Sequence, residues 1–186
     1  MFTESINNIQ LSFETANNLF SPFSIDRGTL AMLSVVNFST DDKLLDLGCG
    51  YGVVGIYAAK LIGVQNIVMS DNNMKCIELS KKNTAKNGLD EIKTIKSNGF
   101  EDIRDTDFTI ILSNPPYHEN FSVPKHFIEK GFNRLKIGGK MFMVTKRKNW
   151  YKNKFIAIFG GVKIHEIDGY FVFCAEKRSN RYANAG

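Results

Sequence analysis

The sequence has few residues that could cross-link the chain or anchor it to a membrane. Its 186 residues include three cysteines, Cys49, Cys76 and Cys174, and none has a partner at a metal-ligand spacing such as C-x-x-C. No apolar run approaches the roughly 20 residues that a bilayer-spanning helix needs. The N-terminus also lacks the basic start and apolar core of a signal peptide. We therefore expect a soluble cytoplasmic protein without metal or membrane partner, with one domain large enough to bury its own core.

Acidic residues are nearly absent from one long segment. Between positions 125 and 154, which we call the basic block, ten lysines and arginines accompany a single acid, Glu129. Aromatic residues interrupt this block, and that mixture is typical of a surface that meets a polyanion. A solvated, lysine-rich face is the alternative interpretation. We favour nucleic acid as the partner, with Lys146, Arg147 and Lys148 as candidate RNA-binding residues.

Strand-like and helix-like segments alternate along most of the chain. The segments with strand character are 43–48, 66–71, 92–97, 108–114, 140–146, 162–167 and 170–177, and those with helical periodicity are 53–63, 74–86, 123–135 and 149–159. Strands separated by helices imply parallel βαβ crossovers, whereas Asp168-Gly169 between the last two strands indicates a hairpin. The predicted fold is α/β: a Rossmann-like, doubly wound sheet of seven strands, mostly parallel, with a C-terminal antiparallel hairpin and helices on both faces.

A glycine-rich loop follows the first of these strands. Gly48, Gly50 and Gly52 stand at the carboxyl end of the strand, where parallel sheets bind ligands and where a glycine turn allows close approach to the backbone. Asp71 ends the next strand, where a carboxylate can accept hydrogen bonds from ribose hydroxyls. Asp46 precedes the loop and would repel a pyrophosphate but attract a cation. These features predict a cationic, adenosine-containing ligand.

The sequence D-x-G-x-G-x-G after a first strand resembles the cofactor loop of class I S-adenosylmethionine-dependent methyltransferases. The resemblance implies that S-adenosyl-L-methionine is the cofactor, with loop 46–52 against its methionine portion and Asp71 at its ribose. Asn98 stands where the family often has an acid that contacts the adenine amino group, and an amide can also offer an acceptor there. The candidate cofactor-binding residues are Asp46, Gly48, Cys49, Gly50, Gly52, Asp71, Asn72, Asn98 and Asn114.

The chain has only four prolines, and two of them are adjacent at the end of an apolar segment. Pro115 and Pro116 have fixed φ and no backbone N–H, so the strand must end there in a rigid corner. With their neighbours they form N-P-P-Y, which looks like the signature of methyltransferases that modify the amino group of adenine, cytosine, guanine or a glutamine side chain. The resemblance implies a catalytic role for Asn114, Pro115, Pro116 and Tyr117. In that role the Asn114 side-chain oxygen and the Pro115 carbonyl accept the two amino N–H groups, and Tyr117 stacks on the base.

The segment 19–33, LFSPFSIDRGTLAML, resembles the lead-in of the "small domain" ribosomal RNA guanine-N2 methyltransferases. This resemblance implies guanine in ribosomal RNA as the substrate, with Phe23 and His118 as further substrate-binding candidates. Adenine methylation, glutamine methylation in a protein and a catalytically silent RNA-binding module are the alternatives. The oligomeric state, monomer or homodimer, stays open.

We expect one methyltransferase domain over residues 1–186. An N-terminal extension with a lead-in helix would occupy 1–40, the cofactor and catalytic core 41–177, and a tail 178–186.

Overall fold

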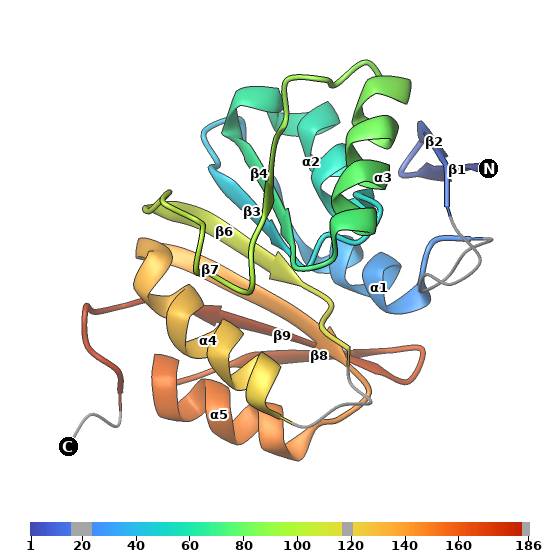
Figure 1. Cartoon of the computed structure of the whole chain (residues 1–186). Coiled ribbons are helices and arrows are strands. Elements are labelled where there is room, and N and C mark those ends of the chain that lie inside the picture. The colour runs from blue at the N-terminus through green and yellow to red at the C-terminus, as the bar shows by residue number, and fades with distance from the viewer. Residues whose placement is uncertain (16–23, 117–120, 184–186) are drawn as a thin grey trace.

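The computed structural model describes residues 1–15, 24–116 and 121–183. Its main sheet has seven strands in the order β5-β4-β3-β6-β7-β9-β8, and this confirms the predicted number and arrangement (Figure 1). β3 lies inside the sheet, parallel to β4 on one side and to β6, the central strand, on the other. The strands are β3 (Leu44–Leu47), β4 (Ile67–Asp71), β5 (Lys93–Lys96), β6 (Phe108–Ser113), β7 (Leu135–Thr145), β8 (Lys163–Ile167) and β9 (Tyr170–Glu176).

Helices cover both faces of this sheet, as the alternating pattern predicts. The helices are α1 (Arg27–Val35), α2 (Val53–Ile62), α3 (Met74–Lys86), α4 (Ser122–Arg134) and α5 (Asn149–Phe159), with a short 3₁₀ turn at Val64–Asn66. Successive strand residues point to opposite faces: Leu44 packs in the core beneath α1 and α2, whereas Leu45 packs in the core beneath α4 and α5. The sheet is therefore doubly wound, with one apolar core on each side.

The C-terminal hairpin is confirmed, and its second strand lies inside the sheet. Asp168 and Gly169 both have positive φ and join β8 to β9, and β9 also pairs antiparallel with β7. β7 itself begins at Leu135, five residues before the predicted start, and its pairing with β6 shifts register between Leu135 and Lys140, where Gly138 has a φ of 83°. A Cβ at Gly139 would lie 2.7 Å from the Phe108 carbonyl oxygen, so this close approach between β6 and β7 requires glycine.

An N-terminal hairpin was not predicted from the sequence. β1 (Phe2–Ile6) and β2 (Ile9–Phe13) pair around Asn7 and Asn8, whose φ values of 47° and 66° suit a tight turn of the I′ type. The hairpin packs beside α3, where the Asn83 side-chain amide donates to the carbonyls of Glu14 and of Tyr51 in the glycine loop. The alternation of apolar and polar residues around Asn7-Asn8 is the signal that would have identified it.

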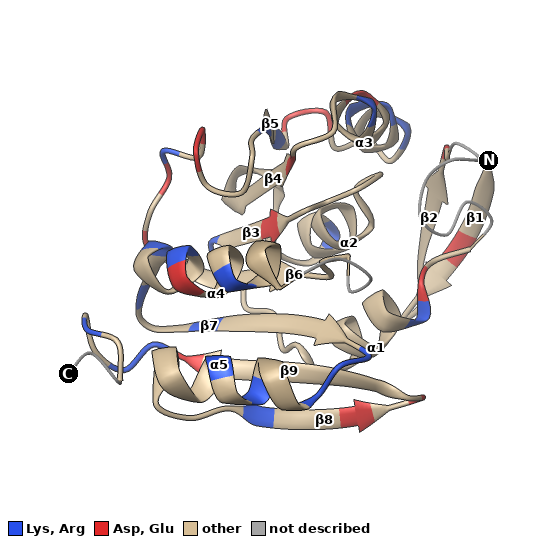
Figure 2. Ribbon diagram, turned by 60° about the horizontal axis from the view of Figure 1, so that its bottom comes forward, with Lys and Arg blue, Asp and Glu red and all other residues tan. Residues whose placement is uncertain are grey.

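The basic block spans α4, β7 and α5, and Figure 2 shows lysine and arginine recurring along these elements and on the segment that joins β7 to α5. In residues 1–15, 24–116 and 121–183, no helix is long and apolar enough to cross a membrane. The same residues contain no group of three or more histidine, cysteine or acidic side chains placed to hold a metal ion.

Candidate active site

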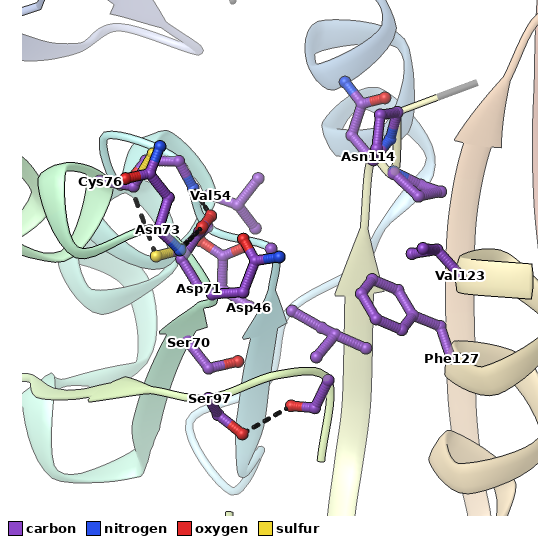
Figure 3. Close-up of a pocket in the computed structure, with 18 of the residues that line it drawn as sticks. Asp46, Val54, Ser70, Asp71, Asn73, Cys76, Ser97, Asn114, Val123 and Phe127 are labelled. Atoms are coloured by element: carbon purple, nitrogen blue, oxygen red, sulfur yellow. Dashed lines mark hydrogen bonds between the residues drawn. The ribbon is translucent and has the colours of Figure 1, made fainter. Parts of the chain in front are cut away.

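A cavity of about 700 Å³ opens at the carboxyl ends of β3, β4 and β6. This is where the strand order reverses, and ligands of doubly wound sheets bind there. In Figure 3, Asp46 and Asp71 lie on one side of the cavity, and Asn114, Val123 and Phe127 lie on the other. The cavity is large enough for a nucleoside cofactor together with part of a substrate.

Most of the predicted site residues meet in this cavity. Those that line it are Asp46, Gly48, Cys49, Gly50, Asp71, Asn72, Asn98, Asn114, Pro115 and Pro116. Gly52 is not among the lining residues: it is the N-cap of α2 with φ 97°, where a Cβ would lie 3.2 Å from Ile56 and 3.3 Å from Ser80. Phe23, Tyr117 and His118 lie outside the described residues. Lys146, Arg147 and Lys148 follow β7 and do not line the cavity.

The Asp71 carboxylate accepts backbone hydrogen bonds that hold the glycine loop in place. Its Oδ2 accepts a hydrogen bond of 2.9 Å from the backbone N–H of Gly50, and its Oδ1 accepts one of 2.9 Å from Asn73. The N–H groups of Gly48 and Cys49 both donate to the Ser70 carbonyl. The sequence suggested only a ribose contact for Asp71, but the same carboxylate also fixes the conformation of the loop.

Asp46 is buried beneath the start of α2. Its side chain is 3% exposed, and its Oδ2 accepts a hydrogen bond of 2.9 Å from the Gly55 N–H. Burial raises the pKa of Asp46 to about 7; the Gly55 hydrogen bond opposes this shift, and the nearby Asp71 carboxylate adds to it. Gly55 is a residue that sequence reasoning missed. A Cβ there would lie 2.3 Å from the Met69 sulfur, so glycine lets α2 pack directly on β4.

Replacing Asp46 by asparagine is expected to stabilise the ligand-free protein at pH 8 but not at pH 4. With a folded-state pKa of about 7 against an ordinary 3.8, the native state keeps a proton that the unfolded chain releases, so the free energy of unfolding falls as the pH rises between these values. The slope is at most ~1.4 kcal/mol per pH unit. The asparagine oxygen can still accept from Gly55. Urea unfolding of both proteins across this pH range measures the effect, and a difference independent of pH would contradict it.

Negative charge dominates the lining of the cavity. Asp26, Asp46, Asp71 and Glu101 contribute carboxylates, and among the described lining residues there is no lysine or arginine. Such a lining attracts a cation and repels a polyphosphate. S-adenosylmethionine carries a sulfonium and an ammonium, so these residues fit that cofactor better than a dinucleotide.

Glu101 lines the part of the cavity for which the sequence predicted only Asn98. The Asn98 side-chain nitrogen donates to Glu101 Oε1 over 3.0 Å, and both residues line the cavity. A carboxylate thus lines the cavity three residues after Asn98, the position at which the family often carries one. The short sequence separation from Asn98 is the only signal that could have identified Glu101.

Two buried polar atoms of residues that line the cavity have no hydrogen-bond partner among the described residues. They are Ser70 Oγ and His126 Nε2. Buried polar atoms in folded proteins almost always have a partner. Their presence in the lining of this cavity is what a site for a polar ligand would show, and neither was identified from the sequence.

Asn114 is held in one orientation by residues at the start of α1. Its side-chain nitrogen donates to Asp26 Oδ2 over 2.7 Å and to Thr29 Oγ1 over 3.0 Å. A carboxylate accepts hydrogen bonds, so the amide nitrogen faces Asp26 and the amide oxygen is the group that can accept from another donor. Asp26 also caps α1 by accepting from the Thr29 N–H. Asp26 was quoted from the sequence only as part of the lead-in segment, and this contact to Asn114 was not foreseen.

Known proteins with similar sequences include ribosomal RNA methyltransferases and a protein named as uncharacterised. The Ribosomal RNA small subunit methyltransferase C of Serratia proteamaculans is 32% identical over 165 residues, which cover 87% of this chain and 47% of that protein. YbxB of Bacillus subtilis is 28% identical over 178 residues, which cover 92% of this chain and 89% of YbxB. The chain thus spans about half the length of the Serratia relative.

The solved structure of a Thermus thermophilus 16S rRNA N2 G1207 methyltransferase, in complex with AdoMet and guanosine, superposes with a TM-score of 0.82 at 25% identity. The superposed region covers 95% of this chain and 50% of the Thermus chain. A methyltransferase from Pyrococcus furiosus shares the fold, with a TM-score of 0.75 at 17% identity, covering 91% of this chain and 90% of that one. The model of the methyltransferase small domain family matches residues 10–174, and the chain therefore belongs to this family of S-adenosylmethionine-dependent methyltransferases.

Proposed function

We propose that this protein transfers a methyl group from S-adenosylmethionine to the 2-amino group of a guanine in ribosomal RNA. The observation that carries the proposal is the fixed orientation of Asn114 in the lining of the cavity, where Asp26 holds the amide nitrogen and leaves the amide oxygen to accept from a substrate. The names of the Serratia and Thermus relatives support ribosomal RNA as the substrate, and the guanosine in the Thermus complex supports the base.

In this mechanism Asn114 and Pro115 prepare the nucleophile. An exocyclic amino group is a poor nucleophile because its lone pair is delocalised into the ring. The Asn114 side-chain oxygen accepts one N–H, the Pro115 backbone carbonyl accepts the other, and the nitrogen becomes more pyramidal with its lone pair localised. Pro115 and Pro116 have fixed φ values, so both acceptors are held with little further loss of entropy.

When bound, S-adenosylmethionine supplies a methyl carbon made electrophilic by its sulfonium. The amino lone pair forms the new N–C bond while the C–S pair returns to sulfur, and one amino proton leaves afterwards to solvent. Asp46 and Asp71 hold the cationic cofactor and its ribose, with Gly48, Cys49 and Gly50 forming the wall of the methionine portion and Asn72, Asn98 and Glu101 facing the adenosine portion.

The experiment that tests this function identifies the methylated nucleoside. The protein is incubated with radiolabelled S-adenosylmethionine and total RNA, and the RNA is digested to nucleosides. We expect label in N2-methylguanosine, with Asn114→Ala as the matched inactive control. Label in adenosine alone would overturn the guanine assignment, and label in protein instead of RNA would overturn the substrate class. Absence of label together with no thermal stabilisation by S-adenosylhomocysteine would favour the silent RNA-binding module.

Reversing the charges of Lys146, Arg147 and Lys148 to glutamate is expected to weaken RNA binding and its dependence on salt together. All three side chains are exposed at the end of β7, and each lost phosphate contact lowers the logarithmic salt slope by about one. Binding titrations at several salt concentrations measure both quantities. The matched control reverses Lys75, Lys81 and Lys82 on α3, outside the basic block. If the reversal of Lys146, Arg147 and Lys148 left the salt slope of RNA binding unchanged, the basic block would be a solvated face and not an RNA-binding surface.

A further inference from the structure

Three side chains form a continuous stack beside the active site. The rings of Phe121 and Trp150 lie 4.3 Å apart at an angle of 15°, and the Arg147 guanidinium carbon lies 5.1 Å from the centre of the Phe121 ring. Tyr151 packs edge-on against both rings, at 6.3 Å from Phe121 and 5.1 Å from Trp150. We call this arrangement the Arg147 stack. Arg147 is exposed, while Phe121 and Trp150 are partly buried.

The Arg147 stack adjoins the catalytic corner. Phe121 directly precedes Ser122 and Val123, which line the cavity, and it is the N-cap residue of α4. Ser113 at the end of β6 pairs with Met143 of β7, so the chain leaves β7 after Thr145 at the same edge of the sheet as Asn114. The stack therefore lies beside the entrance of the cavity, at the sheet edge that carries Asn114.

The cations on either side of Arg147 are also placed against aromatic rings. Lys146 Nζ lies 4.9 Å from the centre of the Tyr170 ring, and Lys148 Nζ lies 5.0 Å from that of Phe171, both on β9. Glu166, itself exposed, lies 3.6 Å from Lys148. Three successive cations thus form a positive surface beside the corner, which complements the charge of an RNA backbone.

Arg147 differs from its two neighbours in chemistry. Its planar guanidinium can stack on the face of a base, whereas lysine is a point charge that suits phosphate. Among the described residues Arg147 has no carboxylate partner, and the Phe121 ring fixes it. Its orientation is already restricted before any ligand binds, so a base stacking on its outer face costs little further entropy.

We propose that the outer face of the Arg147 guanidinium is the stacking site for an unpaired nucleobase next to the target guanine. The inference rests on the proposed function, because it assigns a neighbour of that same substrate. Lys146 and Lys148 hold the adjacent phosphates, and the stacked base fixes the strand so that the guanine can enter the cavity. The substrate is accordingly a single-stranded or locally opened segment of RNA, since a paired base has both faces covered.

The test combines an arginine-to-lysine exchange with removal of single bases. The probe is a fluorescein-labelled nine-nucleotide RNA with one central guanosine flanked by adenosines, compared with RNAs of the same length that carry one abasic nucleotide at each position in turn. We expect Arg147→Lys to weaken binding of the intact RNA about tenfold with little change in salt slope, because the charge stays. For the one RNA whose abasic nucleotide lies beside the guanosine at the stacking position, we expect Arg147→Lys and the natural protein to bind with the same affinity.

Arg104→Lys is the matched control, because it makes the same exchange at an exposed arginine outside the basic block and should bind all the RNAs as the natural protein does. Trp150 is the only tryptophan of the chain, so its fluorescence gives a second readout of a base arriving at the stack. The proposal is wrong if Arg147→Lys weakens intact and abasic RNAs equally, or weakens none. These binding measurements need no methyl transfer. A digest without N2-methylguanosine would overturn the proposed function. If the effect of Arg147→Lys on RNA affinity did not depend on which base is missing, only the stacking site at Arg147 would be overturned.

Discussion

Asn114→Ala is expected to lower the turnover of methyl transfer by at least about 100-fold while the affinity for S-adenosylhomocysteine changes by less than about threefold. The alanine removes the acceptor that localises the amino lone pair, whereas the glycine loop, Asp46 and Asp71 stay in place on the other side of the cavity. Turnover is measured with both substrates saturating, and affinity by calorimetry. A parallel loss of cofactor affinity would show that Asn114 serves binding instead of chemistry.

Asp26→Asn is the companion variant to Asn114→Ala. The carboxylate of Asp26 forces the Asn114 nitrogen toward α1, but an asparagine at position 26 can either donate or accept, so the Asn114 amide loses its single orientation. We expect a partial loss of turnover with little change in cofactor affinity. Thermal unfolding controls for the weakened cap of α1, which costs about 1 kcal/mol or less because asparagine also caps helices well.

Asp71→Ala is expected to weaken cofactor binding by about 30-fold or more while much of the turnover at saturating cofactor is kept. The substitution removes the proposed ribose acceptor and also the hydrogen bond that holds the Gly50 N–H, and each hydrogen bond to a charged group contributes about 1.5–3 kcal/mol. Calorimetry with S-adenosylhomocysteine and the ligand-induced shift of the melting temperature both measure the loss.

The controls for Asp71→Ala separate its two roles. Asp71→Asn keeps one side-chain oxygen for Gly50 and should give an intermediate affinity, whereas Asp90→Ala removes an exposed carboxylate outside the cavity and should have no effect. If Asp71→Ala lost turnover and kept full affinity, the roles of Asp71 and Asn114 would have to be exchanged.

Local patterns were enough to predict most of the fold. The helix expected over 74–86 has those limits in the structure, because its apolar face repeats with helical period, Asn73 caps its start and Asn87 with Gly88 ends it. The seven strands were likewise predicted by their apolar character. The start of β7 differed because it depends on the approach of Gly139 to β6, a contact between segments that are distant in sequence.

The parts of the site that escaped prediction are contacts between distant segments. Asp26 and Asn114 are 88 positions apart and meet only because α1 lies across the end of β6. The hydrogen bond from the Gly50 N–H to Asp71 depends on how the glycine loop folds over the end of β4, and Ser70 and His126 meet at the cavity only because α4 packs beside the ends of the strands. Motifs therefore indicated which residues gather at the site, and the structure showed which residues hold them in place.

The position of β9 has a consequence for how the chain is made. β9 follows β8 in sequence but pairs with both β7 and β8, so β8 has no partner and β7 is paired only with β6 until residues 170–176 have left the ribosome. The strands β5, β4, β3 and β6 form the half of the sheet that carries the glycine loop. They pair with one another without any segment that follows β6, so this half can assemble first. A nascent chain that stalls before Tyr170 leaves the backbone N–H and C=O groups along one edge of β7 unpaired. A chaperone would bind such an intermediate, or a protease would remove it.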